Sequence, residues 1–188
     1  MPTAFIAVDV QNDFCEGGSL PVQGGGDVAR AITRHLDDAS DDYDLVVATR
    51  DFHIDPGAHF SDDPDFVDSW PPHCRVDTPG ASFHPGLDVT KLDVMVSKGA
   101  HEAAYSGFEG ATDDGAPLVD VLRGHDITDV VIGGLATDHC VRATALDAVA
   151  FGFTTTVDLD LAGGVAADTT AAAIDELDAA GVHVLHAP

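Results

Sequence analysis

Basic side chains are scarce in this sequence: 8 lysine and arginine residues stand against 33 aspartate and glutamate residues, and the formal net charge is −25. Proteins that bind nucleic acid neutralise phosphates with clustered Lys and Arg, so this class of partner is excluded. The acidic residues are spread through the chain between Val, Ile, Leu and Ala segments, which argues against disorder. An acidic surface with only two lysines, Lys91 and Lys98, is typical of a protein that works in concentrated salt. We therefore expect the protein to work in the cytoplasm of a halophile.

The chain also lacks a long apolar run, a basic leader and a set of paired cysteines. No segment is apolar over membrane-spanning length, and Met1 to Asp9 has neither the basic region nor the cleavage site of a signal peptide. We therefore expect no membrane partner and a cytoplasmic location. Cys15, Cys74 and Cys140 are an odd number for a reducing compartment, so we expect no disulfide framework and at least one free thiol.

The sequence does contain short β-type apolar runs that alternate with Ala-rich segments of helical period. This alternation over 188 residues predicts an α/β fold: a single domain, residues 1–188, with a six-stranded, mostly parallel sheet flanked by helices on both faces. The predicted strands are 3–8, 44–49, 92–97, 129–133, 154–159 and 182–185. The predicted helices are 28–36, 117–122, 141–150 and 169–180. Two loops, 51–87 with six prolines and 99–116, are too long for plain connections and are expected to be functional.

Four polar residues stand where four apolar runs stop. They are Asp9, Asp51, Lys98 and, a few residues beyond its run, Cys140. Because the carboxyl ends of neighbouring parallel strands line one crevice, these side chains converge if their strands are adjacent. An Asp is close to the default at a strand end in so acidic a chain, whereas one of only two lysines is harder to explain there as a solvated residue.

Cys140 follows a buried strand that turns through small residues into a helix, with Thr137 or Asp138 as the expected N-cap. We expect the thiol in the first helical turn, where N–H groups can form an oxyanion hole and the helix dipole favours thiolate. A nearby Lys98 is expected to lower the thiol pKa further. The alternative is a small buried hydrophobe, which is our interpretation of the other two cysteines. For Cys140 we favour a nucleophile.

The loop 51–87 offers one carboxylate and three imidazoles as candidate metal ligands. These are Asp51, His53, His59 and His73. Such donors suit Zn, Mn or Fe, although their spacing matches no short two-ligand pattern, and solvent-exposed histidines are the alternative. Three aromatic residues near these elements either wall a pocket for a flat ring or belong to the core. These are Phe14, Trp70 and Tyr105.

Four sequence blocks carry a resemblance to a known family. They are VDVQNDF around Asp9, TRDFH with Asp51 and His53, SKG at Lys98, and GLATDHCVRATALDA around Cys140. In this order they resemble the nicotinamidase/pyrazinamidase branch of the isochorismatase-like cysteine hydrolases, and they are far more specific jointly than singly. The resemblance extends from the first strand to the helix after Cys140 and implies an isochorismatase-like, Rossmann-like fold.

The resemblance also implies a site and a reaction. The implied triad is Asp9, Lys98 and Cys140, and the implied ligands of one divalent metal ion (Zn, Mn or Fe) are Asp51, His53, His59 and His73. A cis peptide between Leu135 and Ala136 is implied, which aims the N–H groups of Ala136 and Cys140 at an oxyanion. Phe14, Trp70, Tyr105 and His139 match substrate-pocket positions. The implied reaction is hydrolysis of nicotinamide to nicotinic acid and ammonia through a cysteine thioester, a step of NAD salvage.

Two alternatives stay open beside the nicotinamidase branch. The first is a related amidase that acts on another small carboxamide or carbamoyl compound, with the metal structural or absent. The second is a binding protein without turnover, although binding alone requires no nucleophile, acid–base group and lysine at three strand ends. A redox sensor is disfavoured because no second cysteine is placed to resolve a sulfenic acid. A monomer and a homo-oligomer are both compatible with the sequence.

Overall fold

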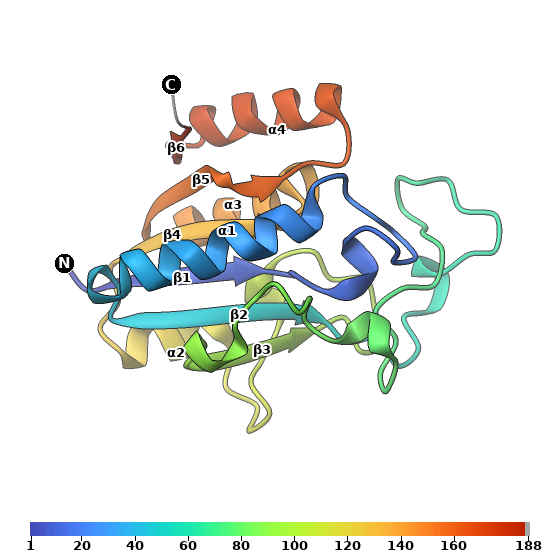
Figure 1. Ribbon diagram of the computed structural model, residues 1–188, viewed down its shortest axis with the longest axis horizontal. Helices are drawn as coiled ribbons and strands as arrows, with labels where there is room; N and C mark the ends of the chain where they lie inside the picture. Colours follow the sequence, from blue (N-terminus) through green and yellow to red (C-terminus); the bar gives the residue numbers. More distant parts are fainter. Residues whose placement is uncertain (187–188) are drawn as a thin grey trace.

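Six parallel strands form one sheet in the computed structural model, which describes residues 1–186 (Figure 1). The strands are β1 (Thr3–Val8), β2 (Leu45–Asp51), β3 (Val94–Lys98), β4 (Asp129–Leu135), β5 (Thr154–Gly163) and β6 (His183–Leu185). Their order in the sheet is β3-β2-β1-β4-β5-β6, and every pairing is parallel. The predicted α/β sheet is therefore confirmed, while the last two residues of the expected domain lie outside the described residues.

The central strand β1 shows why the apolar runs in the sequence are continuous. Phe5 and Ala7 belong to the core on one face of the sheet, and Ala4, Ile6 and Val8 belong to the core on the other. Side chains alternate between the faces of a strand, so a strand covered by helices on both sides needs apolar residues at every position.

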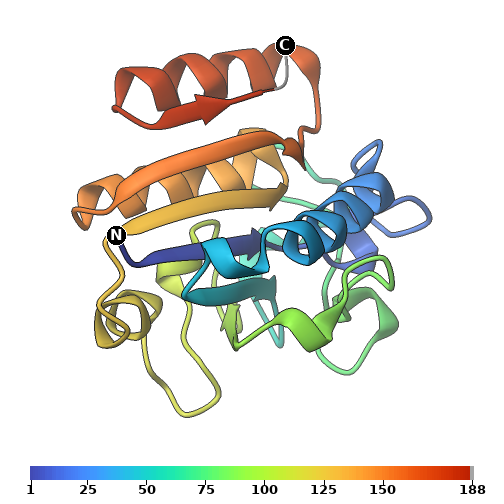
Figure 2. The ribbon, with the colours of Figure 1, turned by 60° about the vertical axis from the view of Figure 1, so that its left-hand side comes forward.

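Helices cover both faces of the sheet (Figure 2). They are α1 (Gly25–Asp38), α2 (Leu118–Gly124), α3 (Arg142–Ala150) and α4 (Ala167–Ala179). Helix α1 packs with Phe5 on one face through residues that include Ile32, whereas α2, α3 and α4 contribute to the core around Ile6 on the other. All four predicted helices are confirmed, with small shifts at their ends.

Strand β5 extends beyond its predicted end at residue 159 to Gly163. The added part reads Asp160-Leu161-Ala162-Gly163, in which Leu161 is buried and Asp160 is exposed. Such alternation is typical of a strand with one solvent-exposed face, whereas the predicted strand ends were taken from continuous apolar runs. The extension matters because it delivers the following residues to the carboxyl edge of the sheet.

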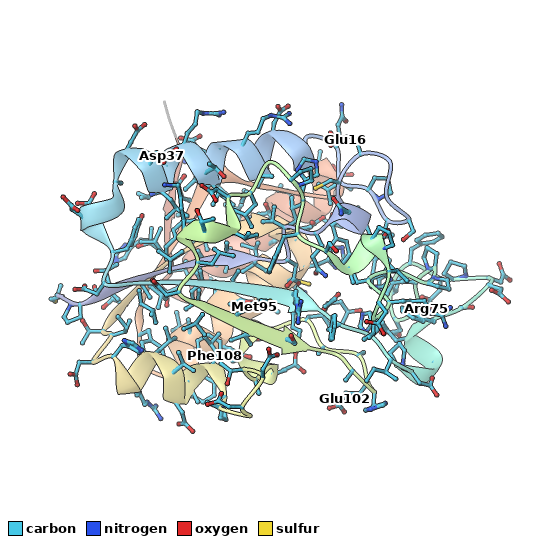
Figure 3. All side chains as sticks on the ribbon, turned by 60° about the horizontal axis from the view of Figure 1, so that its bottom comes forward. Glu16, Asp37, Arg75, Met95, Glu102 and Phe108 are labelled. Carbon is cyan, nitrogen blue, oxygen red and sulfur yellow. The ribbon has the colours of Figure 1, made fainter. Side chains whose placement is uncertain are left out.

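Many acidic side chains lie on the outside of the molecule, although Asp9, Asp51 and Asp138 are buried. Figure 3 shows Glu16 and Asp37 at the two ends of α1 and Glu102 on a distant loop, and all three are exposed. The negative charge therefore lies where dissolved ions can screen it. Within residues 1–186, no helix combines the length and the apolar character that a membrane crossing requires.

Candidate active site

The four predicted strand-end residues do converge, at the carboxyl edge of the sheet. Strand β1 lies between β2 and β4, with Val8 paired to both Thr49 and Gly134, and Asp51 is paired to Lys98 of β3. Asp9 follows β1, and Cys140 lies in the turn that follows β4. Figure 1 shows the long loop 52–87 extending from this same edge, beyond the arrowheads of β1 and β2. The register of three neighbouring strands thus brings distant residues together.

Lys98 is the centre of this cluster. Its Nζ lies 2.8 Å from Asp9 Oδ2 and 3.8 Å from Cys140 Sγ, and it donates a hydrogen bond to Asp51 Oδ1. A fourth contact, at 3.1 Å, goes to the carbonyl oxygen of Ala104. One ammonium group therefore contacts both buried carboxylates and the thiol, and its positive charge stabilises negative charge on each of them.

Burial and pairing set the charges of the two acid–base groups beside the thiol. Burial raises the pKa of Asp9, and the Lys98 ammonium offsets this only in part. Burial would lower the pKa of Lys98, but the carboxylates of Asp51 and Asp9 outweigh it and hold that pKa well above its ordinary value. Lys98 is therefore an ammonium group, and Asp9 is the member of the pair that can exchange a proton.

The expectation that the pKa of Cys140 is lowered was wrong. Burial raises the pKa of this thiol well above its ordinary value, and the nearby carboxylates of Asp9 and Asp51 add to the effect, while Lys98 opposes it. A thiolate next to carboxylates in a dry site is costly, and a single ammonium does not compensate for it. These effects favour the protonated thiol, and the Asp9 carboxylate lies beside it.

The turn that carries Cys140 also differs from the prediction. Thr137–Val141 form a π-helical turn before α3, and the residue at its N-cap position is Ala136, with no side-chain cap. Asp138 does not cap this turn because its carboxylate accepts hydrogen bonds from the segment before α4. The peptide bond between Leu135 and Ala136 is cis, as the resemblance implies.

Three buried histidines face one another beside Asp51. Each offers a nitrogen, and these nitrogens all lie within 4.8 Å of one another; the residues are His53, His59 and His73. Asp51 Oδ2 lies 3.5 Å from His53 Nε2 and 3.7 Å from His73 Nε2. The four predicted ligands are therefore together, and Asp51 joins them to Lys98 through its other oxygen.

Backbone carbonyls fix which histidine nitrogens are free to bind a metal. His53 Nδ1 donates to the Gly99 carbonyl at 2.5 Å, and His73 Nδ1 donates to the Pro71 carbonyl at 2.8 Å. A carbonyl can only accept, so both rings carry their proton on Nδ1 and present the lone pair of Nε2 inward. His53 Nε2 and His59 Nδ1 are buried without a hydrogen-bond partner among the described residues. Three histidine nitrogens beside a carboxylate, two of the nitrogens without another partner, fit a divalent metal ion such as zinc.

Two polar residues that the sequence interpretation missed hold the cluster in place. Thr49 donates its hydroxyl to Asp9 Oδ1 at 2.7 Å. The side-chain amide of Gln11 exchanges two hydrogen bonds of 2.8 Å with the backbone of Asp51. Both residues are fully buried. A polar residue inside or directly after a buried strand is the available signal, since burial requires a partner for each polar atom.

A single cavity contains the thiol, part of the histidine cluster and all four predicted pocket residues. The predicted members on its wall are Phe14, Trp70, Tyr105 and His139, together with Cys140, Ala136, Asp51, His59 and His73. The wall residues that were not predicted are Leu20, Pro21, Val22, Ala104, Leu135 and Val165. These are plain apolar residues with no chemistry to mark them, so the sequence alone offers no signal for their role.

Aromatic side chains line one part of the cavity. Trp70 Nε1 donates to the Tyr105 hydroxyl at 3.0 Å, which ties the loop 51–87 to the loop 99–116. The Trp70 ring meets the His139 ring edge to face at 5.2 Å, and burial lowers the pKa of His139. A small aromatic ligand fits such a wall, because flat rings pack there with little loss of side-chain entropy.

Comparisons with known proteins found a family model and several similar proteins. The Isochorismatase domain model matches residues 3–188. A nicotinamidase/pyrazinamidase of Mycobacterium tuberculosis is 56% identical over 182 residues, 97% of each chain. The solved pyrazinamidase of Pyrococcus horikoshii in complex with zinc is 36% identical, with a TM-score of 0.86 over 100% of both chains. PnC1 from L. infantum in complex with nicotinate is 32% identical, with a TM-score of 0.83 over 98% of this chain and 92% of that one.

Proposed function

The chain belongs to the isochorismatase family, and from this premise we propose that it is an amidohydrolase that converts nicotinamide to nicotinic acid and ammonia. One observation carries the proposal most directly: the Cys140 thiol lies 3.8 Å from a lysine that is ion-paired with Asp9, on the wall of an aromatic pocket beside three histidines. The nicotinate-bound relative has the product of this reaction in its structure, which supports the choice of substrate.

In the proposed first half-reaction, Asp9 takes the proton of the Cys140 thiol as the sulfur attacks the carboxamide carbon. The carbonyl electrons move to oxygen, and the N–H groups of Ala136 and Cys140 are the proposed donors to that oxyanion. Protonated Asp9 then gives its proton to the amide nitrogen as the C–N bond breaks. Ammonia leaves, and a thioester remains on Cys140.

In the proposed second half-reaction, Asp9 takes a proton from water while the water oxygen attacks the thioester carbon. The C–S bond breaks, nicotinic acid leaves, and the proton on Asp9 returns to the Cys140 sulfur. Lys98 keeps its own proton throughout, because two carboxylates hold its pKa high, and its charge stabilises the thiolate that forms and reforms. In each half-reaction Asp9 thus transfers the protons, and Lys98 remains a cation.

Asp51, His53, His59 and His73 are the residues that we propose hold a divalent metal ion, and zinc is our leading candidate. A bound ion of this kind would supply a Lewis-acid centre that can bind the ring nitrogen of a pyridine. The chain's own contribution is orientation, since Trp70 and Phe14 would flank a ring placed beside these ligands.

A related amidase that acts on a different small carboxamide is the alternative. Ammonia release from purified protein in molar salt separates the two functions, with nicotinamide compared with aliphatic amides of similar size. We expect nicotinamide to be hydrolysed and the aliphatic amides to be poor substrates. Folded, metal-loaded protein that releases ammonia from aliphatic amides but not from nicotinamide would establish the alternative.

Replacing His53 with alanine is expected to remove the metal ion and to raise KM for nicotinamide. The change deletes a ligand whose Nε2 has no other partner among the described residues. Loss of a group that only supports a ligand lowers metal affinity by about 10- to 100-fold, so loss of the ligand itself is expected to cost at least as much. Elemental analysis after dialysis checks this result, with the exposed His125→Ala as the matched control. A metal-free His53→Ala protein with full activity would remove the ion from the scheme.

We also propose that the protein works in a halophile's cytoplasm. Its formal net charge is −25, and the acidic side chains repel one another at low ionic strength. The urea midpoint of unfolding is expected to rise between low-salt buffer and molar KCl, because salt screens the acidic surface. Circular dichroism at each salt concentration measures this shift, and a neutral osmolyte at equal osmolality controls for exclusion of solute from the surface. A urea midpoint that is the same in low-salt buffer and in molar KCl would contradict the proposal.

A further inference from the structure

Val165 lies between the active-site cavity and a second hollow. It is on the wall of the cavity that contains Cys140, and it also lines an open groove at the N-terminal part of α4, with Gln23, Gly164, Thr170 and Ile174. It is the residue common to both linings in the part of the chain that the structure describes. Its side chain is half exposed, as expected for a partition with a ligand space on one side and an open groove on the other.

Asp138 holds this partition in position. Its carboxylate accepts hydrogen bonds from the Val165 N–H at 2.9 Å, from the Ala166 N–H at 3.3 Å and from the Thr169 hydroxyl at 2.5 Å. Asp138 is buried and lies two residues before Cys140 in the π-helical turn. The carboxylate therefore links the turn that carries the thiol directly to the segment that carries Val165.

We propose that Val165 is a specificity-determining residue and that Asp138 is the positioning residue that keeps it in place. Resting on the proposed function, this assignment means that Val165 limits the acyl group to one small aromatic ring. The groove behind it is the space that a ring substituent of a larger pyridine carboxamide would occupy. The groove is lined by the polar residues Gln23 and Thr170 and by apolar residues that include Ile174. It therefore suits an uncharged substituent, apolar or weakly polar, better than a charged one.

The size of the expected effect follows from the atoms removed. Val165→Ala deletes two methyl groups from the partition and is expected to open the cavity toward the groove. A difference of one methylene in an apolar pocket changes kcat/KM by about 10- to 200-fold. We therefore expect the ratio of kcat/KM for a phenyl-substituted nicotinamide to that for nicotinamide to rise by at least about 10-fold. Nicotinamide itself loses one wall contact, so its own kcat/KM is expected to fall slightly.

The experiment compares wild type, Val165→Ala and Val89→Ala as holoenzymes in molar salt, with nicotinamide and its 5-phenyl and 6-phenyl derivatives. Val89 is exposed to a similar extent and lines neither hollow, which makes it the matched control. An unchanged ratio for both derivatives in Val165→Ala would overturn the assignment. Asp138→Asn keeps the shape but loses acceptor capacity, so the same ratio is expected to rise in that variant. A lowered melting temperature with no change in the ratio would reduce Asp138 to a structural role.

A binding measurement separates this inference from the proposed function. Calorimetry compares the affinities of nicotinate and 6-phenylnicotinate for wild type and Val165→Ala, and it requires no turnover. Wild type that releases no ammonia from nicotinamide would sink the proposed function, and the binding ratio would then decide the role of Val165. Wild type that is active while both ratios stay unchanged would sink the role of Val165 and leave the proposed function intact.

Discussion

Cys140→Ala is expected to lower kcat for nicotinamide on the order of 10⁴- to 10⁶-fold, because it removes the nucleophile that forms the thioester in the proposed mechanism. The buried thiol touches Lys98 and lies beside Asp9, whereas the two remaining cysteines belong to the core on the opposite face of the sheet. Rapid-quench mass spectrometry of intact protein provides an independent check. The wild type should carry a nicotinoyl adduct during turnover, and the Cys140→Ala protein should carry none.

Cys15→Ala is the matched control for this substitution. Cys15 is also buried, and burial raises its pKa to about 11, so it is a second buried thiol that lies outside the site. Its replacement should change stability slightly and leave the adduct in place. Metal content must be equal in all three proteins, since Cys140 is not among the proposed ligands. A Cys140→Ala protein that keeps substantial turnover would exclude the thioester mechanism.

Lys98→Met is expected to lower the free energy of unfolding by about 3–5 kcal/mol and to abolish turnover. The change removes the ammonium from a site where Asp9 and Asp51 are both buried, so two carboxylates are left without their shared partner. Breaking a buried ion pair leaves an uncompensated charge, which costs more than the pair contributes when intact. Urea unfolding of the metal-free proteins in molar salt measures the difference.

Lys91→Met is a matched control, because Lys91 pairs with Asp37 at the surface. We expect its effect on the free energy of unfolding to be small, because exposed ion pairs contribute little to stability. The loss in Lys98→Met should also shrink as the pH falls. Burial already raises the pKa of Asp9 in the folded protein, so Asp9 takes up a proton first and one of the two uncompensated charges disappears. A pH-independent loss, or equal losses for both lysines, would contradict the assigned role of Lys98.

The sequence was sufficient to predict the sheet and the residues at its carboxyl edge. The apolar runs of buried parallel strands are continuous, and Lys98 stood out because lysine is so rare in this chain. The histidine cluster was predictable as a set of donors, although not its tautomers. Those depend on the Gly99 and Pro71 carbonyls, whose positions follow from the folded loops.

Properties that depend on neighbours distant in sequence could not be predicted. The raised pKa of Cys140 results from burial and from Asp9 and Asp51, which outweigh the lysine that the interpretation relied on. Val165 is a valine among many, and its position between two hollows follows from the extension of β5 and from the hydrogen bonds of Asp138. Residue type indicates chemistry, whereas wall residues are identified only by the shape of the fold.

The scarcity of lysine has a practical consequence for amine-reactive chemistry. Lys98 is fully enclosed, so an active ester can reach only the side chain of Lys91 and the amino group of Met1, which is 91% exposed. Met1 and Lys91 both precede their strands, at the edge of the sheet opposite to Cys140, and β3 alone spans about 15 Å between that edge and Lys98. A dye or a solid support coupled through amines would therefore attach at that far edge and leave the pocket mouth open to substrate.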